Sequence, residues 1–178
     1  MKKALKIVLI VIAIVIAIPL VTALFVKKDY AVERSVVIDR PRQEVFDYVS
    51  LLRNQNVYSK WTELDPGQEF TYSGTDGTVG FISAWKGNKD VGEGEQEITA
   101  VTDGHRMDTR LRFIKPFKSE SDTYLITEEL GPEQTRVRWG FTGRMNYPMN
   151  LFLLVMDMEE AIGSDLDYGL QKLKTLLE

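Results

Sequence analysis

The residue types that most often perform enzymatic chemistry are scarce in this chain. Its 178 residues include no cysteine, which excludes a thiolate nucleophile, a disulfide and a zinc site built from cysteines. The only histidine, His105, follows Asp103 and Gly104, a pair typical of an exposed turn. A histidine-based triad and a multi-histidine metal site are therefore excluded.

The carboxylates give no stronger sign of a reaction centre. Glu93, Glu95 and Glu97 share one face of a strand-like stretch, and nothing nearby completes a coordination shell, so we expect a solvated strand edge. Three more carboxylates fall within 157–160, where they suit the positive end of a helix. A general-acid role for Asp157 would require burial. With no phosphate loop or nucleophile elbow in the sequence, we expect no catalytic residues, no metal and no cofactor.

The element on which the rest of the chain depends is its last stretch, 149–178, which we predict to be one long helix. Its apolar residues recur at steps of three and four, the spacing that aligns them on one face. That face must pack against the other elements. The residues of the stripe are Leu151, Val155, Met158, Ile162, Leu166, Gly169, Leu173 and Leu176.

The partner of this helix is a run of strands with a period of two. After a first strand at 31–39, a helix that starts at Pro41 and a short helix at 54–60, the alternating pattern begins at residue 69. Turn signals separate the segments by short connections, which predicts an antiparallel meander. The predicted strands are 69–73, 81–86, 91–101, 106–114, 119–129 and 135–144.

The two faces of the predicted sheet differ in character. One face carries apolar residues and threonines, as in Met107, Thr109 and Leu111. The other face places an acidic strand between two basic ones, so cross-strand ion pairs account for the arginines without a bound anion. The charged positions are Asp108, Arg110, Arg112, Glu120, Asp122, Glu128, Arg136 and Arg138.

The N-terminal part of the chain is of a different kind. Residues 7–26 form an uncharged apolar run about 30 Å long as a helix, which matches the thickness of a bilayer core. Three lysines and the amino terminus precede the run and two lysines follow it, which favours a cytoplasmic N-terminus. A cleaved signal peptide is the alternative, but the run is longer than its usual apolar region. We expect 1–29 to be a single-pass anchor in the cytoplasmic (inner) membrane and 30–178 to be an extracytoplasmic domain.

The order of these elements resembles the helix-grip fold of the START-like superfamily, also labelled SRPBCC or polyketide cyclase/dehydrase-like. The stretches 32–38 with 41–49, 92–94 ahead of 97–99, 113–117, and 162–166 leading to Gly169 and Leu170 are similar to a bacterial, often membrane-anchored branch. The resemblance covers nearly all of 30–178. It implies an α+β fold in which an antiparallel sheet of about seven strands wraps around a long C-terminal helix, after one N-terminal transmembrane helix.

In such a fold the concave face of the sheet and the long helix enclose an apolar interior. The resemblance implies a ligand pocket there, for a lipid, a sterol-like molecule or a flat aromatic compound. The same residue types also describe an ordinary packed core, and that alternative stays open. The ligand-facing candidates are Trp85, Gln96, Ile98, Met107, Thr109, Leu111, Leu125, Thr127, Trp139 and Phe141, with Met156, Ile162 and Leu166 from the helix.

Two loops carry further apolar side chains. We expect Phe117, in the loop 115–118, and Tyr147, Met149 and Phe152, before the helix, to gate the cavity or to dip toward the bilayer. Packing of these side chains against each other is the alternative.

Three functions are compatible with the sequence. The first is a membrane-tethered, non-catalytic binding domain for a small hydrophobic molecule or lipid. The second is a cyclase-like enzyme, by family analogy alone, in which Thr109, Gln96 or a bound water handles protons. The third is a protein-interaction module with a filled core. The net charge of −4 argues against nucleic acid as a partner.

Overall fold

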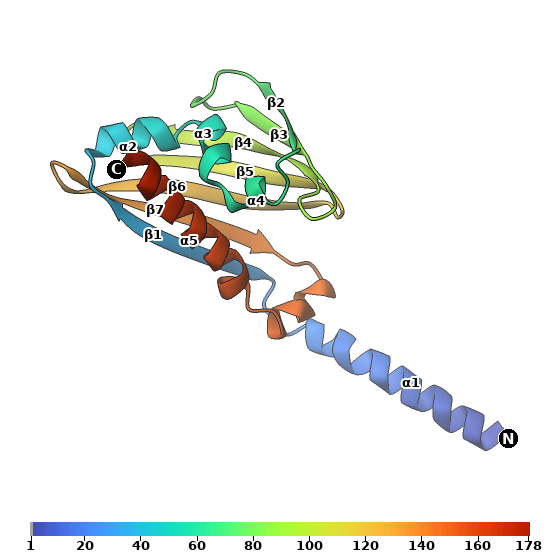
Figure 1. Cartoon of the computed structure of the whole chain (residues 1–178). Coiled ribbons are helices and arrows are strands. Elements are labelled where there is room, and N and C mark those ends of the chain that lie inside the picture. Colours follow the sequence, from blue (N-terminus) through green and yellow to red (C-terminus); the bar gives the residue numbers. More distant parts are fainter. Residues whose placement is uncertain (1) are drawn as a thin grey trace.

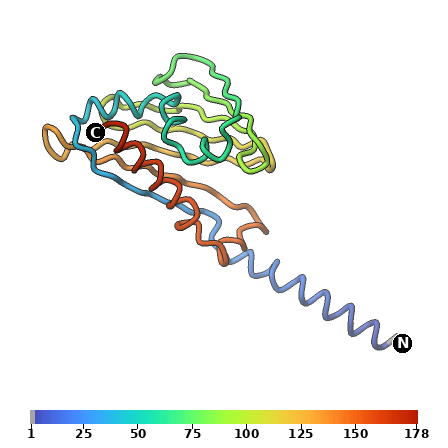
Figure 2. The backbone as a smooth tube through the Cα atoms, in the orientation of Figure 1, coloured from blue at the N-terminus to red at the C-terminus, as the bar shows by residue number. Residues whose placement is uncertain are grey.

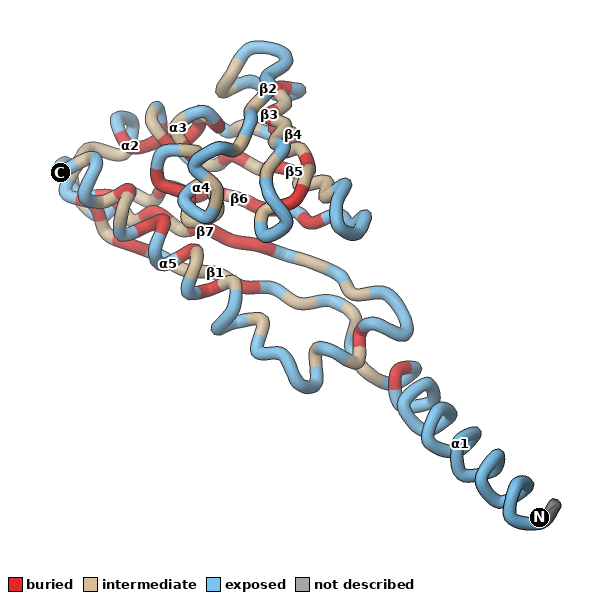
Figure 3. The backbone as a smooth tube through the Cα atoms, turned by 45° about the vertical axis from the view of Figure 1, so that its right-hand side comes forward, coloured by how far each residue is buried: buried red, intermediate tan, exposed pale blue. Residues whose placement is uncertain are grey.

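The computed structural model describes residues 2–178, and it separates an N-terminal helix from a compact body. Helix α1 (Lys2–Ala23) projects from one end of the body (Figures 1 and 2). The stretch Lys3–Ala23 is long and apolar enough to cross a membrane, and none of its most hydrophobic window is buried against the body (Figure 3). An N-terminal signal sequence would meet the same criteria.

The body is built on one antiparallel sheet of seven strands, as the sequence predicts. Its order is β1-β7-β6-β5-β4-β3-β2, so that β2 to β7 form a meander and β1 pairs with the last strand. Each strand starts and ends within a few residues of its predicted position. The strands are β1 (Asp29–Ile38), β2 (Glu69–Ser73), β3 (Ile82–Lys86), β4 (Glu93–Thr102), β5 (Arg106–Lys115), β6 (Ser119–Gly131) and β7 (Gln134–Arg144).

The register of the sheet brings the alternating residues into rows on its two faces. Thr109 lies opposite Thr123, and Leu125 lies opposite Trp139, all on the inner face. The tight β4–β5 connection contains Gly104, whose φ of 66° suits glycine. The predicted α+β, helix-grip arrangement is confirmed.

Four helices lie over one face of the sheet (Figure 1). They are α2 (Arg42–Val49), α3 (Leu52–Tyr58), α4 (Lys60–Glu63) and α5 (Met158–Leu177). The short helix predicted at 54–60 is in fact α3 and α4, because Ser59 has an extended backbone (ψ 133°) that separates them.

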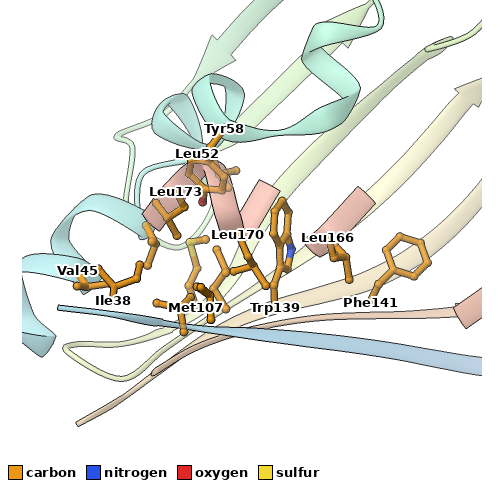
Figure 4. Packing of buried hydrophobic residues seen from close by; sticks show 14 of the residues in the cluster. Ile38, Val45, Leu52, Tyr58, Met107, Trp139, Phe141, Leu166, Leu170 and Leu173 are labelled. Carbon is orange, nitrogen blue, oxygen red and sulfur yellow. The ribbon is translucent and has the colours of Figure 1, made fainter. Parts of the chain in front are cut away.

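Helix α5 packs along β1 and closes the core. Its residues Leu166, Leu170 and Leu173 are at most 1% exposed and point toward Trp139 and the other inner-face side chains (Figure 4). Each fully buried leucine of this kind contributes roughly 1.5–3 kcal/mol. Gly169 lets the helix approach the sheet, since a Cβ there would lie 2.8 Å from Trp139 Cζ3.

The prediction of one helix over 149–178 is wrong at its start. A 3-10 segment, η1 (Met149–Leu154), precedes α5, and the chain is not helical between them. Asp157 caps α5, because its carboxylate accepts a hydrogen bond from the Glu160 N–H (3.0 Å) and its own backbone is extended. Val155, which the stripe placed against the sheet, is 80% exposed.

The outer face of the sheet carries the charged residues, and most of the expected cross-strand pairs form. Arg110 pairs with Asp122 (2.9 Å), and Arg138 pairs with Glu128 (2.8 Å) and with Glu33 on β1 (2.8 Å). Arg112 pairs with Glu95 (2.9 Å) on β4 rather than with an acidic residue of β6. These ion pairs account for the arginines.

Candidate functional site

The inner face of the sheet, under α5, brings together most of the residues that the sequence marked as ligand-facing. Nine of the thirteen are buried, three are partly exposed and one is exposed. The buried ones are Gln96, Ile98, Met107, Thr109, Leu125, Thr127, Trp139, Phe141 and Leu166; the partly exposed ones are Trp85, Leu111 and Ile162; Met156 is 46% exposed.

A line of polar side chains crosses this apolar face. Gln96 Nε2 donates to Thr109 Oγ1 (2.9 Å), and Thr109 Oγ1 shares a hydrogen bond with Thr123 Oγ1 (2.6 Å). Gln55 Oε1, from α3, also accepts from Gln96 Nε2 at 3.4 Å. We call these four residues the polar line. All four are at most 9% exposed, so they put hydrogen-bonding groups inside an otherwise apolar interior.

Sequence reasoning missed two members of the polar line as site residues. Thr123 shares its face with Leu125 and lies opposite Thr109, so strand parity and register together could have found it. Gln55 comes from a helix, and no periodic signal assigns it to the sheet. Thr127 was predicted as ligand-facing, and its hydroxyl donates to Gly104 O (3.1 Å) in the β4–β5 turn.

Tyr58 adds a buried hydroxyl to the same interior. It is fully buried, its ring packs edge-on against Trp139 (5.7 Å between centroids), and its Oη has no hydrogen-bond partner within residues 2–178. Burial raises the pKa of this phenol far above its usual value, so the hydroxyl stays neutral. A neutral hydroxyl can donate one hydrogen bond to a ligand or a water.

Asp165 and Asp167 flank the buried Leu166 on α5, and Asp165 is the less exposed of the two. Desolvation raises the pKa of Asp165, while Lys60 on α4 acts in the opposite direction. No sequence signal separated it from the solvated carboxylates of the same helix.

The inner face is less completely covered toward β3 and β5. Trp85 and Phe113 pack edge to face there (5.8 Å between centroids), and both remain partly exposed together with Leu111. Apolar side chains left partly accessible beside a buried polar line are the composition expected at the opening of a ligand site.

Two hollows lie outside this interior. One, of about 550 Å³, is on the outer face near the start of β1, and its charged residues include the Arg110–Asp122 and Arg144–Asp29 pairs. The other, of about 760 Å³, lies beside the end of α1 and is lined by residues that include Met156. The predicted gate residues Phe117, Tyr147, Met149 and Phe152 are 43–82% exposed.

The remaining candidates for chemistry show ordinary structural contacts. His105 is exposed in its turn, and Asp157 is exposed as a helix cap. Glu93 pairs with Lys115 (2.8 Å), and Glu95 pairs with Arg112. Within residues 2–178, no group of three or more histidine or acidic side chains is placed to hold a metal ion.

Comparison with known proteins places the chain among proteins of this fold. The model of a family described as polyketide cyclase / dehydrase and lipid transport matches residues 30–178. No curated protein matches the sequence.

Several solved structures share this arrangement. A protein from Nitrosospira multiformis is 15% identical, with a TM-score of 0.61 over 84% of this chain and 97% of that one. Norcoclaurine synthase from Thalictrum flavum, solved with dopamine and hydroxybenzaldehyde, is 12% identical, with a TM-score of 0.60 over 83% and 86%. Major latex-like protein 151 from Panax ginseng is 12% identical, with a TM-score of 0.58 over 84% and 97%. At these identities the likeness shows the fold alone.

Proposed function

Because this chain belongs to the polyketide cyclase/dehydrase and lipid transport family, we propose that it is a membrane-tethered, non-catalytic binding domain for a small hydrophobic molecule or lipid. In this proposal residues 1–29 anchor the chain and residues 30–178 bind the ligand. The observation that carries it is the polar line inside an apolar, incompletely covered interior.

The composition of the interior suits an apolar ligand with one or two polar groups. Trp139, Phe141 and Leu166 would contact the apolar part, while Gln96 and Thr109 would orient a hydroxyl or carbonyl. A core that serves only stability gains little from four buried polar side chains, since their hydrogen bonds mainly offset the cost of removing them from water. Tyr58 supplies an additional donor.

The tether is consistent with such a ligand. An apolar compound concentrates in the bilayer, so a binding domain held there meets it at a high effective concentration. With the N-terminus in the cytoplasm, α1 would be a single pass through the inner membrane and the domain would lie outside the cytoplasm. The family match begins at residue 30, where the anchor would end.

The exposed gate residues would border the route of the ligand between bilayer and interior. Phe117 lies in the β5–β6 turn, and Tyr147, Met149 and Phe152 follow β7. Replacing Phe117 and Phe152 by serine should weaken association of the domain with liposomes while leaving the fold intact. Unchanged association would contradict the gate.

A cyclase-like enzyme is the second candidate, favoured by Asp165 with its raised pKa and by the fold shared with norcoclaurine synthase. It predicts turnover of a bound compound that Asp165→Asn abolishes without loss of stability. The third candidate, an interaction module with a filled core, predicts no ligand at all.

The experiment is a binding titration of the full chain in detergent with a panel of lipids, sterols and flat aromatic compounds. Leu111→Trp narrows the partly exposed part of the inner face, and Leu130→Trp, at an exposed position of β6, is the matched control. We expect the first variant to weaken binding by roughly tenfold or more and the second to leave it unchanged. Equal affinity of both variants would contradict the site, and the absence of any binding would favour the interaction module.

A further inference from the structure

The hollow beside the end of α1 is formed by two segments far apart in sequence. One wall comes from residues 25–27, 29 and 30, which follow α1, and the other comes from residues 153–158, which run from the end of η1 to the first residue of α5. In Figure 1 this connection, drawn in orange, lies against the end of α1. Its volume of about 760 Å³ is within the range of small-molecule sites.

Hydrogen bonds join the segments around the hollow to the end of α1. Asn150 is fully buried, and its Nδ2 donates to Ala23 O (2.7 Å), at the last residue of α1, and to Val26 O (3.0 Å), shortly after it. The Met145 N–H donates to Lys28 O (2.8 Å), and β1 begins at the next residue. These hydrogen bonds join the end of α1 and the residues after it to η1 and to the segment that follows β7.

The surface around the hollow is strongly apolar. Phe25 is 83% exposed, Val155 80%, Leu154 61% and Met156 46%. Neighbouring apolar side chains exposed to this degree are uncommon on a surface that faces water, and they mark contact with a partner or a membrane. Each of these four side chains lies within a few residues of α1 or of η1, which Asn150 joins to α1 by hydrogen bonds.

The polar groups at the hollow leave one charge available. Asp29 pairs with Arg144 (2.9 Å) and Asp157 caps α5, so both carboxylates have partners. Lys27 is exposed and makes no ion pair with any residue in 2–178. An ammonium beside an apolar hollow is complementary to a phosphate that carries acyl chains.

We propose that this hollow binds a phospholipid of the bilayer, with an acyl chain against Phe25, Leu154 and Val155 and the phosphate near Lys27. The inference rests on the proposed spanning role of α1, which would set the hollow where acyl chains meet headgroups. It is separate from the inner-face site: of the residues that the sequence marked as ligand-facing, only Met156, which is 46% exposed, lines the hollow. A phospholipid held here would fix the domain against the membrane surface.

The test uses the full chain reconstituted into nanodiscs of phosphatidylglycerol and then released for native mass spectrometry. The variant is Leu154→Ser/Val155→Ser, and the control is Val79→Ser, which is 62% exposed in the turn before β3, near the opposite edge of the sheet from β1. We expect one phospholipid to stay bound to the wild type and to the control, and roughly tenfold or greater loss in the double variant. Lys27→Gln should lower retention of phosphatidylglycerol but not of uncharged diacylglycerol.

Equal retention by the wild type and the double variant, or no retained lipid on the wild type, would overturn the proposal. The outcome is separable from the fate of the inner-face site, because Leu111→Trp should leave phospholipid retention unchanged. In the same way, Leu154→Ser/Val155→Ser should leave the affinity measured in the ligand titration of the inner-face site unchanged. Extraction of the wild-type chain by alkaline carbonate would show that α1 does not span the membrane and would overturn the tether and this site together.

Discussion

Replacing Thr109 by valine tests whether the polar line is a connected network. The substitution keeps the shape of the side chain and removes the hydroxyl that joins Gln96 to Thr123 (2.9 and 2.6 Å). Gln96 Nε2 then keeps only its long contact of 3.4 Å to Gln55, and the Thr123 hydroxyl loses its partner. Each buried group left without a partner costs about 1–3 kcal/mol, so we expect a loss of about 3 kcal/mol in the free energy of unfolding.

The assay is thermal unfolding of the full chain in detergent, followed by tryptophan fluorescence. A loss of about 3 kcal/mol lowers Tm by roughly 6–12 °C in a domain of this size. Thr123→Val alone should cost about 1 kcal/mol, and the double variant about 1.5 kcal/mol, well below the sum of the single variants, because it leaves only Gln96 unpaired. Thr71→Val, at an exposed threonine of β2, is the control and should change stability by less than about 0.5 kcal/mol. A Thr109→Val cost below about 0.5 kcal/mol, or additive costs in the double variant, would refute the network.

Three further predictions concern the junction, the outer face and the core. Asn150→Ala removes the two hydrogen bonds that join η1 to the end of α1, which should lower the local stability of this junction by about 1–3 kcal/mol. Trypsin should then cleave faster at the lysines that follow α1. An unchanged cleavage rate would show that Asn150 does not hold the junction. The hydrogen bond from Arg138 lowers the pKa of Glu33 in the folded state. The ionised Glu33 therefore stabilises the fold fully above its unfolded-state pKa, near 4.5, and this stabilisation is lost as the pH falls through its folded-state pKa. Arg138→Gln should therefore lower Tm less at pH 3 than at pH 7, and an equal decrease at both pH values would contradict this. Gly169→Ala should lower the free energy of unfolding by about 1 kcal/mol, because crowding of Trp139 (about 1–3 kcal/mol) outweighs the gain in helix propensity (about 1 kcal/mol). Gly131→Ala, where a Cβ would meet no atom within 4 Å, is the control. Equal Tm values for the wild type and Gly169→Ala would show that α5 shifts to accommodate the added methyl group.

The strands and their faces could be predicted because each strand repeats a period of two and each turn carries its own signal. Thr109, Leu125 and Trp139 are buried as parity requires. The start of α5 could not be predicted from the apolar stripe, since Val155 fits the helical period although Asp157 starts the helix two residues later.

The site was less accessible to sequence reasoning because its members meet only in the folded chain. Gln55 and Tyr58 come from α3 and reach the interior by the packing of that helix on the sheet. Asn150 lies in a stretch that looks like ordinary helix, yet its side chain fastens η1 to α1 across more than a hundred residues of sequence. The hollow beside α1 is formed by segments that this contact brings together, so no local sequence pattern predicts it.

The most direct test of the proposed function is native mass spectrometry of the full chain purified from a lipid-containing host, followed by organic extraction and identification of bound molecules. Besides a phospholipid held beside α1, which Leu154→Ser/Val155→Ser should remove, the proposal predicts a reproducible adduct that Leu111→Trp removes and Leu130→Trp retains. A wild-type chain at its sequence mass, whose Tm is unchanged across the lipid, sterol and aromatic panel, would contradict it.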